Sequence, residues 1–244
     1  MRFSNPRGVA VKAAALSLVP ASILLIARLL PAEDSPRPEA AAKTREALVL
    51  AFRTNLGYCA EWLGAKDYKS LWQSVAALTI LSEAIGRHTA EAGTEQLAAL
   101  RTAINELSAA AKAEDAGRAK RAIDALPAAI AAVATVPSAD SPAAVRKTSA
   151  GFTPLMHLID GTFTDAKTAL ATGDAATAKT YSVALAELGQ VLALDRAGQQ
   201  WHEQSADLVS AANELARSQT DDPKQLREQF HHLYVNCEAC HQRR

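Results

Sequence analysis

The chain has 244 residues, with 26 Lys or Arg and 26 Asp or Glu, so its formal net charge at pH 7 is zero. This balance, without a basic stripe along the sequence, excludes a typical nucleic-acid-binding protein. Alanine is abundant, aromatic residues make up 5%, and β-branched runs are rare. We therefore predict an all-α protein.

The N-terminus has the order of an export signal. Arg2, Arg7 and Lys12 precede an uncharged, mostly apolar run from Ala13 to Ala27. We expect residues 1–32 to be a cleaved signal peptide or an uncleaved membrane anchor, because the run approaches the ~20 residues that a span requires. The basic flank would stay inside. The predicted location is therefore the periplasm, with the protein either soluble or tethered to the inner membrane.

The rest of the chain divides into two halves. A linker rich in Pro, Glu and Asp covers residues 33–42, and a second break lies at Pro137–Pro142. Residues 43–136 and 143–244 are each long enough for a four-helix bundle. We predict two tandem four-helix bundles behind the N-terminal signal or anchor helix.

The halves align at a nearly constant offset, which we interpret as a tandem duplication. The turn-like Ala65–Asp67 matches Thr172–Asp174, and Glu114–Asp115 matches Asp221–Asp222 before the last helix of each half. In the second half, the expected helices are Pro154 to about Thr172, Asp174 to about Asp195, Gln199 to Ser218, and Pro223 to the end. Thr153, Asp174 and Asp222 are the predicted N-caps. Short connections make neighbouring helices antiparallel.

The residues Cys237, Cys240 and His241 form a C-x-x-C-H motif, which is typical of c-type haem attachment. Two thiols form thioether bonds with the haem vinyl groups, and the adjacent imidazole is a common proximal iron ligand. The motif continues a helical stripe that begins with Phe230, Leu233 and Tyr234. A thioredoxin-like or zinc site is the alternative. The first would follow a strand, and the second needs a fourth ligand.

The segment from Ala143 to Arg244 resembles the cytochrome c prime family, including its six-coordinate, low-spin relatives. The resemblance rests on four expected helices that end in the C-x-x-C-H motif. It implies one covalent haem c on Cys237 and Cys240, with His241 as the proximal ligand. The family usually has an Arg after this histidine, for which Arg243 and Arg244 are candidates, but the aromatic residue that often precedes that Arg is missing.

The start of the first helix of this half should face the other side of the iron. Met156 shares an apolar stripe with Phe163, whereas His157 lies on a polar stripe. We predict that Met156 is the sixth ligand and that Phe163 also contacts the haem. The resemblance supports a methionine, because the low-spin relatives use one from their first helix. A five-coordinate iron and ligation by His157 or another histidine remain the alternatives.

The first half has Ile130, Val133 and Ala134 where the second has its two cysteines and histidine. We therefore predict a bundle without haem. Because family members often pair through their first two helices, this half is expected to replace a second subunit in an internal pseudo-dimer, or else to dock a redox partner. Cys59 is expected to be a buried small hydrophobe.

The sequence thus predicts an exported cytochrome that carries electrons to or from a periplasmic redox partner. The alternative is a five-coordinate haem module that binds a small gas such as nitric oxide. A structural or thiol-redox protein without haem is the third hypothesis. No constellation of catalytic acid, base and nucleophile is apparent in the sequence, so we do not predict an enzyme.

Overall fold

The computed structural model describes residues 38–194 and 202–242, with the side chains of the last helix described as far as Val235. Over this part of the chain the protein is all-α, as predicted, and contains no β-strand. Its helices are α2 (Pro38–Gly64), α3 (Tyr68–Arg87), α4 (Thr94–Lys112), α5 (Ala116–Thr135), α6 (Phe152–Ala171), α7 (Ala175–Ala193), α9 (His202–Arg217) and α10 (Pro223–Gln242), with one 3₁₀ turn at Glu91–Gly93.

The predicted leader, residues 1–32, lies outside the described residues, and α2 begins inside the predicted linker at Pro38. No helix of the described segments is long and apolar enough to cross a membrane.

The α2–α3 and α6–α7 turns have the same local geometry. Asp67 and Asp174 each cap the following helix by accepting a hydrogen bond from the amide three residues later, at 3.0 Å in both turns. The residue before each cap has a positive φ, 56° at Lys66 and 82° at Gly173. Gly173 adopts this conformation without the steric cost that a Cβ imposes. These turns are the ones that align between the two halves of the sequence.

Of the three N-caps predicted in the second half, Asp174 is confirmed by the turn described above, and the other two have different outcomes. Helix α10 begins at Pro223, and Asp222 Oδ1 accepts a hydrogen bond from the Lys224 amide at 3.0 Å, so this cap is confirmed. The prediction that Thr153 caps α6 is wrong. Gly151, with φ 88°, precedes the helix, which already begins at Phe152. A glycine can turn the chain into a helix through a backbone conformation that Thr avoids.

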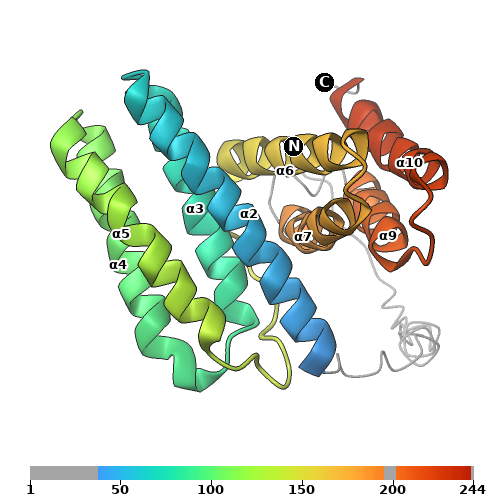
Figure 1. The fold of residues 1–244 in the computed structure, drawn as a ribbon, viewed down its shortest axis with the longest axis horizontal. Coiled ribbons are helices and arrows are strands. Elements are labelled where there is room, and N and C mark those ends of the chain that lie inside the picture. Colours follow the sequence, from blue (N-terminus) through green and yellow to red (C-terminus); the bar gives the residue numbers. More distant parts are fainter. Residues whose placement is uncertain (1–37, 195–201, 243–244) are drawn as a thin grey trace, which may run out of the picture. The chain divides into compact units, whose positions relative to one another are not determined.

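Residues 38–194 and 202–242 belong to one compact unit. In the first half, α2 packs against α3 and α5, and α4 packs against the same two helices, as Figure 1 shows. In the second half, α6 packs on α7, α7 on α9 and α9 on α10, while α10 also reaches α6. Buried leucine, isoleucine, valine and alanine side chains from both halves join into one hydrophobic cluster.

The halves meet through α2 with α7 and α3 with α6. Tyr58 donates a hydrogen bond to Asp165 Oδ1 at 2.7 Å, and the hydroxyl oxygens of Thr54 and Tyr181 are 2.7 Å apart. Burial, with help from Asp165, raises the pKa of Tyr58, so its hydroxyl stays protonated and acts as the donor. Polar contacts therefore fix the register between two largely apolar helix pairs.

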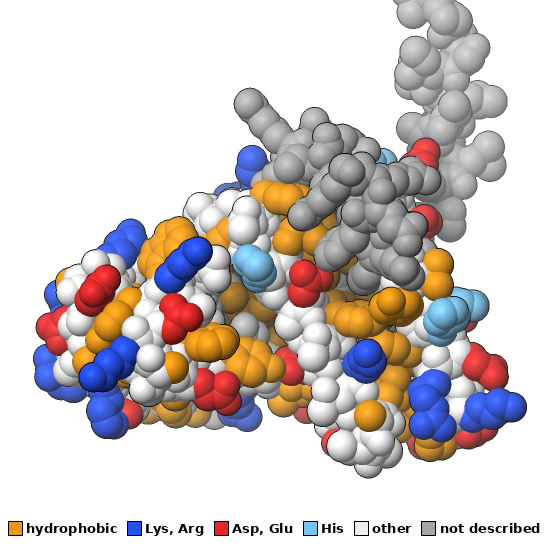
Figure 2. All heavy atoms as spheres, turned by 90° about the horizontal axis from the view of Figure 1, so that it is seen from above, with side chains coloured by type: hydrophobic (Ala, Val, Ile, Leu, Met, Phe, Trp, Pro, Cys, Tyr) orange, Lys and Arg blue, Asp and Glu red, His pale blue; other side chains and the backbone are white. Residues whose placement is uncertain are grey.

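The face drawn in Figure 2 carries charges of both signs. Lys and Arg side chains lie among Asp and Glu side chains, and apolar side chains reach the surface between them. On this face there is no broad basic area of the kind that binds nucleic acid.

Candidate functional site

The C-x-x-C-H motif occupies the last turns of α10, which remains helical to Gln242. The side chains of Cys237, Cys240 and His241 lie outside the described ones, so their predicted bonds to haem stay predictions. The site can be built from the two helical turns that precede the motif and from the helix that faces them.

Aromatic rings join α10 to α6 just before the motif. Phe163 of α6 stacks on Phe230 of α10 with ring centroids 4.6 Å apart, and its ring is 6.3 Å from that of Tyr234. Phe230 and Leu233 are buried, as the predicted stripe requires. Tyr234 is 42% exposed, so it lies at the edge of the stripe rather than inside the core.

Met156 and His157 of α6 have different surroundings. Met156 is partly buried and packs against the hydrophobic cluster. His157 is exposed. It lines a cavity of about 260 Å³ between α2, α3 and α6, together with Tyr58 and Gln73. Met156 therefore has the more apolar surroundings of the two, as the helical pattern of the sequence predicted.

A hollow of about 490 Å³ lies between α2 and α5 of the first half and α7 of the second. Val49 and Ala134 line it, together with three charged side chains of α2, namely Arg45, Glu46 and Arg53. Val49 aligns with Met156, and Ala134 aligns with His241, at the same offset that relates the two matching turns. The two positions of the first half that correspond to the predicted iron ligands thus line one cavity, which lies where this half meets α7.

Cys59 is fully buried in the first half, as predicted. Burial raises the pKa of its thiol to about 12, so the reactive thiolate is scarce at neutral pH. His231 and His232 are exposed. In the described part of the chain, no group of three or more His, Cys, Asp and Glu side chains could hold a metal ion.

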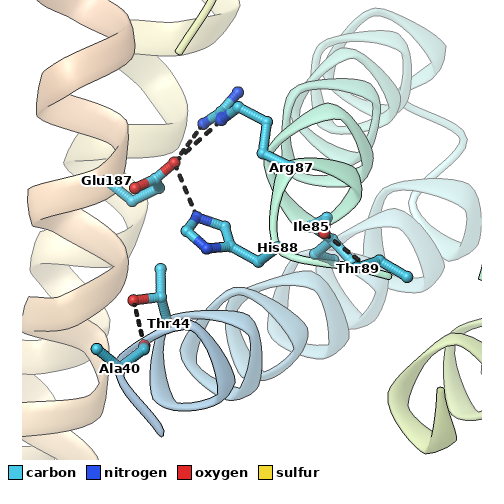
Figure 3. Close-up of polar contacts among 7 residues, drawn as sticks. All are labelled: Ala40, Thr44, Ile85, Arg87, His88, Thr89 and Glu187. Atoms are coloured by element: carbon cyan, nitrogen blue, oxygen red, sulfur yellow. Dashed lines mark hydrogen bonds and ion pairs between the residues drawn. The ribbon is translucent and has the colours of Figure 1, made fainter. Parts of the chain in front are cut away.

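A buried polar cluster between the halves was not predicted from the sequence. Glu187 of α7 is 6% exposed, and its Oε1 accepts hydrogen bonds from Arg87 Nε at 3.1 Å and Nη2 at 2.5 Å. Nε2 of His88 lies 3.2 Å from the same oxygen, as Figure 3 shows. Neither ring nitrogen of His88 has a hydrogen-bond partner among the described residues, so its contact with Glu187 is a close approach of Nε2 rather than a hydrogen bond. The missed signal is a charged residue inside the apolar run of α7.

Burial by itself raises the pKa of the Glu187 carboxyl. The contact with His88 and the positive charge of Arg87 outweigh this cost, so the pKa lies below its usual value. The carboxylate is therefore charged at neutral pH and links α3 to α7.

Comparison of the chain with family models, curated proteins and solved structures gave no match. The functional argument therefore depends on the residues and contacts of this chain.

Proposed function

We propose that this protein is an exported c-type cytochrome that binds one haem covalently and carries electrons. The observation that carries the proposal is the C-x-x-C-H motif at the end of α10, one turn beyond rings that pack on α6. Haem has a large, flat apolar surface, and burying it beside such rings is favourable.

The arrangement we propose is two tandem four-helix bundles. The neighbour relations of α2 to α5 close a ring of four helices, and those of α6, α7, α9 and α10 repeat that order. The matched turns at Asp67 and Asp174 support a duplication. Short turns between successive helices favour an up-down-up-down path in each half.

The aligned residues of the first half indicate where Met156 and His241 should lie in the second half. Because Val49 and Ala134 line one cavity, the corresponding Met156 and His241 are expected to approach the same space in the second half. Met156 lies two turns before Phe163, and His241 lies two turns after Tyr234. In an antiparallel pair of helices these positions lie at the same end.

In the proposed haem site, each of these residues has a different role. Cys237 and Cys240 would hold the haem, while His241 and Met156 would supply an imidazole nitrogen and a thioether sulfur to its iron. The bound haem would supply one-electron chemistry, and histidine–methionine ligation raises the reduction potential. Phe163 and Phe230 would exclude water from the site, which lowers the local dielectric constant and also tunes the potential.

The visible absorption spectrum of protein matured in a host that attaches haem c tests this function. We expect sharp α and β bands on reduction, because two strong axial ligands give a low-spin iron. A broad high-spin spectrum that changes with carbon monoxide would contradict electron transfer and favour gas binding. A colourless protein would leave only a structural or thiol-redox role.

The first half, in our proposal, replaces a second subunit. A two-fold interface pairs residue i with j and j with i, and the pairs α2 with α7 and α6 with α3 correspond in this way when the halves are aligned. Tyr58 and Asp165, which are hydrogen-bonded, are themselves corresponding positions. Their contact therefore lies where the pseudo-two-fold axis would pass.

The same symmetry accounts for the cavity beside His157. The hydrogen-bonded pair Thr54 and Tyr181 corresponds to Gly161 and Ser74, which both line that cavity. Smaller side chains at the corresponding contact leave space that the larger pair fills on the other side of the axis.

An internal pseudo-dimer predicts that the soluble part of the protein is a monomer, because both faces used for pairing are already covered. Sedimentation velocity at micromolar concentration should give the mass of a single chain. A stable dimer would contradict the pseudo-dimer but leave the haem proposal untouched.

The basic leader followed by an apolar run supports export to the periplasm. We propose that the protein exchanges electrons there with a redox partner, either free in solution or tethered to the inner membrane through an uncleaved residue 1–32 segment.

A further inference from the structure

A second cavity lies between α6 and α10, away from the end that carries the motif. It has a volume of about 480 Å³, within the usual range for sites of small molecules. Leu170 and Phe230 are buried and form its apolar base, while the partly exposed ring of Tyr234 stands at its side.

The two charged residues that line this cavity are both basic. Lys167 comes from α6 and Arg227 from α10, next to His231, and the described lining contains no Asp or Glu. Lys167 and Arg227 are exposed, and neither forms an ion pair with a carboxylate of the described residues. Two positive charges without acidic partners beside an apolar hollow attract an anion.

We propose that this cavity binds a small organic anion with a flat, apolar body and one carboxylate or sulfonate group. The guanidinium of Arg227 can hold two oxygens of the acid group at once, with the Lys167 ammonium beside it. The flat body lies on the ring of Tyr234, which is 42% exposed, above the apolar base that contains the buried Phe230.

The binding proposal does not depend on haem. The described lining of the cavity ends at Tyr234, one helical turn before Cys237. It shares Phe230 with the proposed haem site but does not include Met156. The absorption spectrum reports the haem content of each sample separately, so failure of one proposal is distinguishable from failure of the other.

The test is calorimetric titration of the mature, full-length protein with 2-naphthalenesulfonate. We expect saturable binding to one site, which weakens at least about tenfold in the Arg227→Gln and Lys167→Gln variants. Lys224→Gln is the matched control, because it removes an exposed positive charge from the same helix outside the cavity. This control should bind the probe like the unchanged protein.

Three results would overturn the inference. These are no saturable binding, equal weakening by Lys224→Gln and Arg227→Gln, or equally tight binding of the uncharged 2-naphthalenemethanol. Because Lys167 and Arg227 are exposed, all three variants should keep the helical circular dichroism of the parent, so loss of binding cannot come from loss of the fold.

Discussion

Replacing Met156 with alanine is expected to convert the low-spin spectrum of the reduced protein into a high-spin one. In our proposal, the substitution removes the thioether sulfur and leaves His241 as the only protein ligand of the iron. The change should also lower the reduction potential, because histidine–methionine ligation is the arrangement that raises it. Absorption spectroscopy and a potentiometric titration of the variant measure the two effects.

The matched control is His157→Ala, one residue further along α6. This side chain is exposed and lines the cavity toward α2 and α3, so its removal should leave the spectrum low-spin. An unchanged spectrum in Met156→Ala would exclude Met156 as a ligand. A high-spin spectrum in His157→Ala alone would assign the sixth position to the histidine instead.

The Glu187→Gln variant is expected to unfold with a free energy about 3 kcal/mol lower than that of the unchanged protein at pH 7. The substitution leaves the Arg87 guanidinium, whose side chain is 10% exposed, without the carboxylate that neutralises it. Breaking one partner of a buried ion pair is costly because the other charge stays desolvated. Urea denaturation followed by circular dichroism measures the difference.

A control of the same chemistry is Glu106→Gln. Glu106 accepts from Arg118 Nη2 at the same distance of 2.5 Å, but the two side chains are 55% and 43% exposed. Water replaces a lost partner at such a site, so the change in unfolding free energy should be much smaller. Equal effects of the two substitutions would contradict the assignment of the Glu187 cluster as a clamp between the halves.

The contribution of Glu187 to the free energy of unfolding should decrease in acid. The pKa of Glu187 is lower in the folded protein than its ordinary value of 4.5. The carboxylate therefore contributes its full stability above pH 4.5, and this contribution is lost as the pH falls through the lower, folded-state pKa. The gap in unfolding free energy between the unchanged protein and Glu187→Gln should therefore narrow as the pH falls below 4.5.

Local signals in the sequence were sufficient to predict much of the fold. Asp174 and Asp222, each followed by a helical pattern, placed two helix starts correctly, because a side chain that caps a helix acts within three residues. The start of α6 was misplaced, since Gly151 competed with Thr153 and the choice depended on a backbone angle that the residue pattern does not encode.

Local sequence patterns could not predict the contacts between the halves. Tyr58 and Asp165 are distant in the sequence, and the residues around each of them do not indicate that the two side chains form a hydrogen bond. Glu187 carried a usable signal, because a carboxylate inside a buried stretch of helix needs a cation nearby. For Phe163 and Phe230, the sequence predicted only that each residue lies on the apolar stripe of its own helix. It did not predict that the two rings stack on each other.

The central claim is that the C-terminal thiols carry a haem. Mass spectrometry of the last proteolytic peptide from properly matured protein tests it most directly. Our account predicts that the peptide with Cys237 and Cys240 is heavier by one haem group and has no thiol left to alkylate. A peptide of unmodified mass, with both cysteines free or joined in a disulfide, would contradict it.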